Sequence, residues 1–211
     1  VALTDRSTRL ADLPFAAEVL ANSPVYDSDA LRHWAASPAD RRAVMSEWGT
    51  VLMHGAGIVV LRRAFDDLAV VDAASEVFRD LIVQQHATNS GGGDHFAKPG
   101  ANDRIWNALE KHCRRDPEGF ARYFANPVIA MVCEAWLGPG YQMTAQVNVV
   151  NPGGEAQLPH RDYHLGFQSS ETCAAYPAHV HALSQVLTLQ GAVAHVDMPV
   201  PEPNLATVVE I

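Results

Sequence analysis

Residues 141–154, YQMTAQVNVVNPGG, mark the point at which the hydrophobic pattern of the chain changes. Within this stretch polar and apolar side chains alternate, and a period of two residues is typical of a half-buried β-strand. We predict a strand over residues 141–150, followed by a turn at residues 151–154 that contains proline and two glycines. Gln146 and Asn148 then lie on one face of the strand, because successive side chains point to opposite faces.

The chain before residue 138 has the period of an α-helix instead. Ser37 precedes Pro38 and Asp40, an order that predicts an N-cap, a first-turn proline and an acidic residue in the first turn. The predicted helices cover residues 37–55, 66–86, 104–115 and 117–137, the last broken at Asn126–Pro127 and closed by Gly138, and residues 57–63 form a buried strand. After the turn, two further strands are predicted at residues 179–189 and 192–198. The glycine-rich segment 88–103 is predicted to be a loop, of a length that is often functional.

Helices that precede strands in this way predict an α+β fold. No internal repeat or linker divides the sequence, so we expect a single domain over residues 1–211. Its first part, residues 1–138, is expected to be mainly helical with one early strand, and residues 139–211 to form the β-rich part.

Composition excludes several classes of protein. The chain has 211 residues, 48% of them hydrophobic, which is typical of a globular protein and not of a disordered one. A formal net charge of −9 disfavours nucleic acid and anionic membranes as partners. No apolar stretch approaches the roughly 18 residues of a membrane span. The three cysteines show no pairing pattern, which favours the reducing cytoplasm as the location.

The segment 158–164, LPHRDYH, carries the most informative polar residues. In an extended strand His160 and Asp162 share one face and lie about 6.6 Å apart along the chain. An imidazole and a carboxylate at this spacing are typical of the two-His, one-carboxylate triad that binds ferrous iron. A surface hydrogen bond between the two side chains is the alternative interpretation. His164 continues the same face, but three ligands on one straight strand span roughly 13 Å, so we expect it in a substrate pocket.

The order of these segments resembles the phytanoyl-CoA dioxygenase family over about residues 45 to 200. The resemblance rests on residues 57–62 (GIVVLR), 146–153 (QVNVVNPG), 159–162 (PHRD) and 189–199 (LQGAVAHVDMP). It implies a double-stranded β-helix, a cupin-like jelly-roll barrel with flanking N-terminal helices, that uses Fe(II), 2-oxoglutarate and O₂. It also implies that His160 and Asp162 are the first two iron ligands. Asp at position 162 is similar to the hydroxylases and unlike the related halogenases.

Two residues that the family carries cannot be assigned. No arginine follows Asp162, and His195 lies in a strand where the family has no ligand. We therefore expect the third iron ligand and the arginine that binds 2-oxoglutarate to lie in sequence beyond that printed. The alternative is a catalytically inactive jelly-roll module that binds a small molecule without a complete iron triad.

The resemblance implies a dioxygenase that hydroxylates a small organic molecule and releases succinate and CO₂. Gln146 and Asn148 are expected to contact 2-oxoglutarate or the substrate. The second interpretation is that they only make hydrogen bonds to other polar groups of the core. Gln185 is open to the same two interpretations. A basic patch for a bulky anionic substrate is conceivable, with a solvated helix face as the alternative. The residues of this patch are Lys98, Arg104, Lys111, Arg114 and Arg115. The sequence does not indicate the substrate or the oligomeric state.

Overall fold

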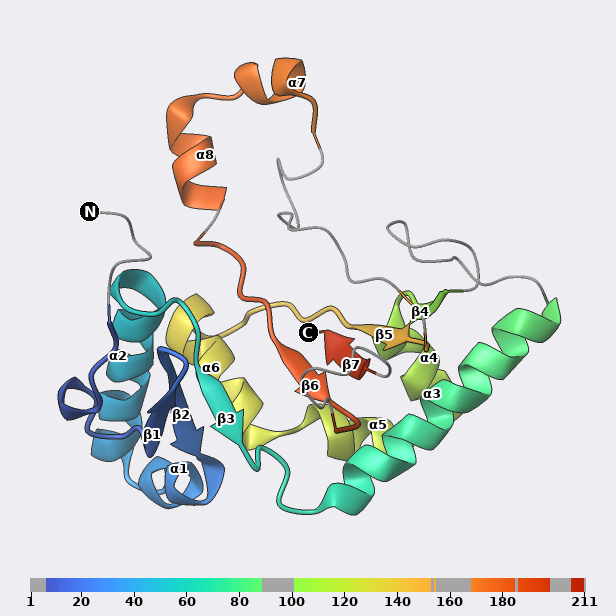
Figure 1. The fold of residues 1–211 in the computed structure, drawn as a ribbon, viewed down its shortest axis with the longest axis horizontal. Helices are drawn as coiled ribbons and strands as arrows, with labels where there is room; N and C mark the ends of the chain where they lie inside the picture. The colour runs from blue at the N-terminus through green and yellow to red at the C-terminus, as the bar shows by residue number, and fades with distance from the viewer. Residues whose placement is uncertain are drawn as a thin grey trace. The chain divides into compact units, whose positions relative to one another are not determined.

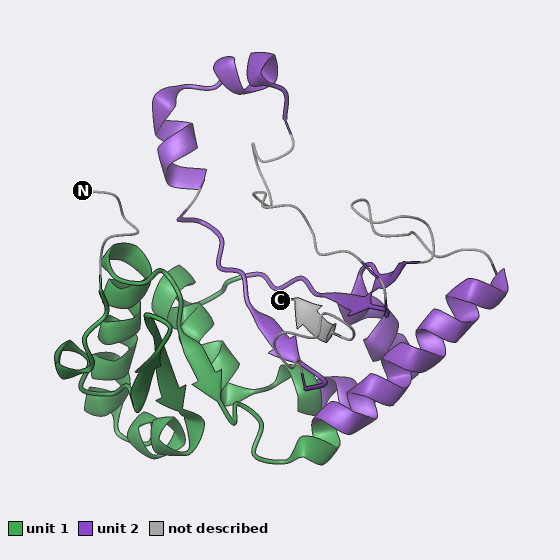
Figure 2. Cartoon of the chain, in the orientation of Figure 1, with its two compact units in different colours: residues 1–70, 122–141 green, residues 71–121, 142–211 purple. Residues whose placement is uncertain are grey.

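The structure is a computed structural model that describes residues 7–88, 101–152, 154, 168–184 and 186–197, and the backbone of 206–210. The chain divides into two compact units, which Figure 2 distinguishes by colour. The first unit combines Val1–Val70 with Arg122–Tyr141, and the second combines Val71–Ala121 with Gln142–Ile211. A single domain over residues 1–211 stays a prediction.

The first unit contains a three-stranded sheet and four helical segments of the described chain. Its strands, in the order β1-β2-β3, are β1 (Glu18–Leu20), β2 (Ser23–Asp27) and β3 (Val60–Arg62). Its helices are the short 3₁₀ turn η2 (Leu10–Asp12), α1 (Ser28–Ala35), α2 (Pro38–His54) and α6 (Pro127–Leu137). In its core Tyr26 packs edge-on against Trp48, with ring centroids 5.7 Å apart, and the Tyr26 hydroxyl donates to Glu47 Oε1 at 2.9 Å. The apolar rings therefore join β2 to α2.

The helix boundaries of this unit follow the capping residues that the sequence predicts. Ser37 caps α2 by accepting a hydrogen bond from the Asp40 amide at 3.4 Å, and Pro38 opens the helix. The break predicted at Asn126–Pro127 is the start of α6, where Asn126 also accepts from two backbone amides, a cap that was not predicted. Gly138 ends α6 with a φ of 79°, in the region that glycine tolerates best. These predictions are confirmed.

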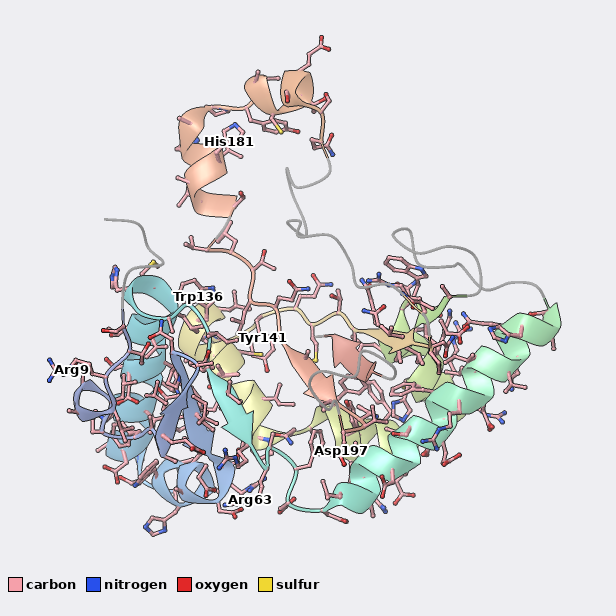
Figure 3. All side chains as sticks on the ribbon, in the orientation of Figure 1. Arg9, Arg63, Trp136, Tyr141, His181 and Asp197 are labelled. Atoms are coloured by element: carbon pink, nitrogen blue, oxygen red, sulfur yellow. The ribbon has the colours of Figure 1, made fainter. Side chains whose placement is uncertain are left out.

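Arg63, which is labelled in Figure 3, joins the end of β3 to the start of α1 through two ion pairs. Its guanidinium pairs with Asp27, the N-cap residue of α1, and its Nε donates to Asp29 at 3.0 Å. The pKa of Asp27 is held below its usual value by the backbone hydrogen bond from Asp29 and by Arg63. All three side chains are substantially exposed, so the pairing orders the junction more than it stabilises the unit.

The second unit is built around a four-stranded antiparallel sheet (Figure 1). The strands, in the order β4-β5-β7-β6, are β4 (Asn102–Ile105), β5 (Gln146–Val150), β7 (Ala206–Glu210) and β6 (Ala192–Ala194). The helices are α4 (Ala108–Arg115), α7 (Ser170–Ala174), α8 (Ala178–Ser184) and most of α3 (Leu68–Thr88) and α5 (Pro117–Phe124). Strand β5 lies inside the sheet and pairs with β4 on one side and with β7 on the other.

Several predicted elements are wrong. The hairpin of β1 and β2 precedes the early strand that was predicted, so the first part of the chain contains more than one strand. Residues 104 and 105 belong to β4 instead of a helix, because they pair with β5 and Asn107 then adopts a left-handed φ of 55° before α4 begins. The strand predicted at 179–189 is the helix α8 over its first half. There His181 Nε2 makes a hydrogen bond to the carbonyl of Cys173.

The predicted burial of β3 is also wrong. Val60 is 39% exposed, and Ile58, just before the strand, is exposed as well. Strand β3 lies at an edge of its sheet in the part of the chain that the structure describes, so it is covered less than β2. The strands predicted at 141–150 and 192–198 are present but shorter, as β5 and β6.

Helices and strands in these proportions confirm the α+β class. Neither sheet closes on itself within the described ranges, where the strand order of each is linear. Among the helices that the structure describes, none combines the length and the apolar character needed to cross a membrane.

The two caps give a test of the fold. Asn126 accepts from the Val128 and Ile129 amides and donates to the carbonyl of Ala64 at 2.8 Å, while Ser37 makes one long, exposed bond. We expect Asn126→Ala to lower the free energy of unfolding by about 2 kcal/mol and Ser37→Ala by at most about 1 kcal/mol. Urea unfolding measures both. Equal losses, or a larger loss for Ser37→Ala, would contradict the assigned bonds.

Candidate active site

Strands β4 and β5 give the sheet two chemically different faces. In the register of this pair Ile105 lies opposite Val147, and both side chains are fully buried, at 0% exposure. Arg104 lies opposite Asn148 on the other face, and Gln146 shares that face with Asn148. One side of the sheet is therefore apolar core, and the other carries an arginine and two carboxamides. We call Arg104, Gln146 and Asn148 the polar face.

A direct hydrogen bond joins the two strands across the polar face. The guanidinium of Arg104 donates from Nε to Gln146 Oε1 at 3.1 Å and also from Nη2 to the same oxygen. The guanidinium carbon lies 4.1 Å from the centroid of the Trp106 ring, within the range of a cation–π interaction. Arg104 is only 8% exposed, so both contacts form in a largely desolvated setting.

A second polar contact fixes the end of β5. Asp103 accepts from the Asn151 side chain at 3.0 Å and lies 2.6 Å from His86 Nε2. Gly154 follows in a tight turn, in which its amide donates to the carbonyl of Asn151 at 2.7 Å. This is the turn that the sequence predicts after the strand, and it leads to the segment that contains His160.

The structure reports on only some of the residues predicted to form the site. Gln146 and Asn148 share a face of β5 as predicted, although no observation tests what they bind. His160, Asp162, His164 and Gln185 lie outside the described residues. In the part of the chain that is described, no three His, Cys, Asp or Glu side chains come together as a metal site would require. Iron ligation by His160 and Asp162 therefore stays a prediction.

His195 follows β6 and is partly buried in the second unit. Its Nδ1 lies 2.7 Å from Ser75 Oγ, whose single hydroxyl proton is donated to the Val71 carbonyl at 2.8 Å. Nδ1 must therefore carry a proton and donate it to Ser75 Oγ. Burial, with the charge of Arg79 as a second cause, lowers the pKa of His195 to about 4. The ring also packs against Phe78, at a centroid distance of 5.8 Å.

Arg104 is the residue of the polar face that sequence reasoning misplaced. It was considered as part of a basic patch on a helix, whereas it lies in β4. The other described arginines of that patch are in ion pairs, Arg114 with Glu110 at 2.7 Å and Arg115 with Asp80 at 3.0 Å. The only signal in the sequence was the position of Arg104 two residues before an aromatic residue, Trp106, which follows the end of β4.

Comparison with known proteins identifies the family. The sequence matches the family model described as Phytanoyl-CoA dioxygenase (PhyH) over residues 53–202, which is more than half of the chain. The chain belongs to the phytanoyl-CoA dioxygenase family. No curated protein and no solved structure matches it in the corresponding searches. Members of the phytanoyl-CoA dioxygenase family are typically oxygenases that use Fe(II) and 2-oxoglutarate, and the matched span includes β4, β5 and the segment with His160 and Asp162.

Acidification should destabilise the second unit through His195. Its pKa in the folded protein is about 4, below the ordinary value of about 6.5, so the unfolded chain binds the proton more tightly. The stabilising contribution is complete above about pH 6.5 and is lost as the pH falls toward 4. We expect the urea midpoint to fall between pH 7.5 and pH 5, and to fall less in His195→Gln. His179→Gln, on exposed α8, is the control and should behave as wild type. The same pH dependence in His195→Gln and wild type would contradict the assignment.

The turn after β5 can be tested at Gly154. A Cβ added there would lie 2.9 Å from the carbonyl oxygens of Ala101 and Asn151, and closer still to the side-chain oxygen of Asn102. We expect Gly154→Ala to distort the turn and to cost about 1–3 kcal/mol in urea unfolding. Gly191→Ala is the matched control, because its Cβ would meet no atom within 4 Å. If both variants unfold at the wild-type midpoint, the close approach at Gly154 is wrong.

Proposed function

We propose that the protein is an Fe(II)- and 2-oxoglutarate-dependent dioxygenase that hydroxylates a small organic molecule, with succinate and CO₂ as co-products. Family membership over residues 53–202 is the observation that carries this proposal. The polar face supports it, because a buried arginine beside two carboxamides suits an anionic cosubstrate such as 2-oxoglutarate. In this proposal the sheet of β4, β5, β7 and β6 is part of a jelly-roll barrel, and the polar face lines its interior.

His160 and Asp162 would hold the iron. A neutral imidazole and a carboxylate are the donors that non-haem Fe(II) sites use, and their two-residue spacing puts them on one face of an extended segment. When bound, iron supplies the activation of O₂ that organic side chains cannot provide. Because His160 must be neutral to bind a metal, metal affinity should decrease as the pH falls through the range in which histidine protonates.

The residues of β5 would bind and orient the cosubstrate. Gln146 and Asn148 present carboxamides, which donate and accept hydrogen bonds without adding a negative charge that would repel 2-oxoglutarate. Val147, between them in sequence, points into the core and is fully buried, so the backbone that carries both carboxamides is anchored from behind. This anchoring limits the motion of the polar face. Rigid placement of binding groups is what keeps a cosubstrate in a reactive orientation.

The remaining parts of the proposal come from composition. A net charge of −9 disfavours nucleic acid as a partner, so a small molecule is the proposed substrate. The spacing of the three cysteines is the reason to place the protein in the reducing cytoplasm.

The direct test is turnover of 2-oxoglutarate. We expect the protein, supplied with Fe(II), ascorbate and 2-oxoglutarate, to release succinate in the presence of a suitable small molecule. The measurement is succinate by mass spectrometry across a panel of candidate substrates, with the metal-free protein as the control. No succinate with any candidate, together with no metal-dependent binding of 2-oxoglutarate, would favour an inactive binding module.

The metal ligands can be tested apart from turnover. We expect His160→Ala and Asp162→Ala each to weaken Mn(II) binding, used as a stable surrogate for Fe(II), by at least about tenfold, because each removes one ligand. His179→Ala, on exposed α8, is the matched control and should bind as wild type. Calorimetry measures the affinity and circular dichroism checks the fold. Metal binding at wild-type affinity in a folded His160→Ala variant would refute the ligand assignment.

A further inference from the structure

The contact between Arg104 and Gln146 constrains the carboxamide of Gln146. An arginine side chain carries only hydrogen-bond donors, so the atom that faces it must be the acceptor, Oε1. Two donors of Arg104, Nε and Nη2, converge on that one oxygen. The opposite orientation would bring the Gln146 NH₂ group against the guanidinium, donor against donor. The chemistry of Arg104 therefore selects one of the two orientations of the amide.

The hydrogen bonds of Arg104 connect β4 to β5, and other contacts hold the guanidinium in its position. Arg104 lies opposite Asn148 in the register, one diagonal step from Gln146, which is within reach of a long side chain. Just beyond the end of β4, Trp106 lies under the guanidinium, with the guanidinium carbon 4.1 Å from the ring centroid. Because Arg104 is only 8% exposed, water competes little for its donors. The amide of Gln146 is consequently fixed before any ligand arrives.

We propose that Arg104 is a positioning residue that turns the Gln146 carboxamide so that its NH₂ group donates to a carboxylate oxygen of 2-oxoglutarate. This inference rests on the proposed function, since it assumes that the polar face binds the cosubstrate. Gln146 Nε2 carries two N–H donors on the side of the amide away from Arg104, and a carboxylate is an acceptor with no competing donor. Gln146 is neutral, so it can turn its two N–H donors toward a carboxylate without adding a negative charge that would repel it.

A double-mutant cycle separates positioning from a direct or a purely structural role. In the Mn(II)-loaded protein we expect Arg104→Leu to weaken 2-oxoglutarate binding about tenfold, and Gln146→Leu to weaken it by at least as much. If Arg104 acts through Gln146, the double variant binds no more weakly than Gln146→Leu alone. Arg104→Lys should recover part of the affinity, because one ammonium donor can still face Oε1. Arg115→Leu, which removes an exposed arginine of α4, should bind as wild type.

Kinetics and spectroscopy give readouts that a structural defect would not reproduce. We expect Arg104→Leu to raise the KM for 2-oxoglutarate about tenfold and to change kcat less than twofold, because the side chain does not touch the reacting atoms. In nuclear magnetic resonance of ¹⁵N-labelled protein, the Gln146 side-chain NH₂ signals should shift in Arg104→Leu even without ligand, and stay unchanged in Arg115→Leu.

The outcomes distinguish this inference from the proposed function. Wild-type protein that binds no 2-oxoglutarate contradicts the proposed function, and with it the ligand assigned to Gln146. Wild-type protein that binds normally, with additive losses in the double variant or with no loss in Arg104→Leu, contradicts the inference alone. If Arg104→Leu does not fold, Arg104→Lys takes its place. Unchanged affinity for 2-oxoglutarate together with unchanged Gln146 side-chain signals in Arg104→Lys would then contradict the positioning role.

Discussion

Strand β5 carries the constraint on which the second unit depends. It is hydrogen-bonded on both sides, to β4 and β7, so its side chains cannot change face without breaking two ladders. Val147 is fixed in the core by its pairing opposite Ile105, and this pairing forces Gln146 and Asn148 to the other side. The chemical character of the polar face thus follows from the packing of an apolar valine.

The polar face concentrates positive charge in an acidic protein. The chain as a whole has a net charge of −9, yet Arg104 lies almost entirely buried among carboxamides and an indole ring. Burying a guanidinium costs free energy unless its donors are satisfied, and the bonds to Gln146 and the stack on Trp106 offset part of that cost.

Local signals in the sequence predicted local structure well and long-range structure poorly. Ser37, Asn126 and Gly138 act within a few residues of themselves, and the helix ends that they predict are correct. The strand β4 was missed because it exists through pairing with β5, and Arg104 finds its partner 42 residues away. His195 likewise finds its hydrogen-bond partner Ser75 at a separation of 120 residues. For the candidate site, alternation alone correctly put Gln146 and Asn148 on one face, whereas the arginine beside them had no comparable signal.

In the function that we propose, His160 and Asp162 would hold the metal beside the polar face of β5. Paramagnetic broadening by Mn(II) tests this most directly, because it falls off steeply with distance from the metal. The account predicts that Mn(II) broadens the side-chain NH₂ signals of Gln146 and Asn148 in wild-type protein and that the broadening is lost in His160→Ala. Mn(II) that binds through His160 while both signals stay sharp would contradict the account.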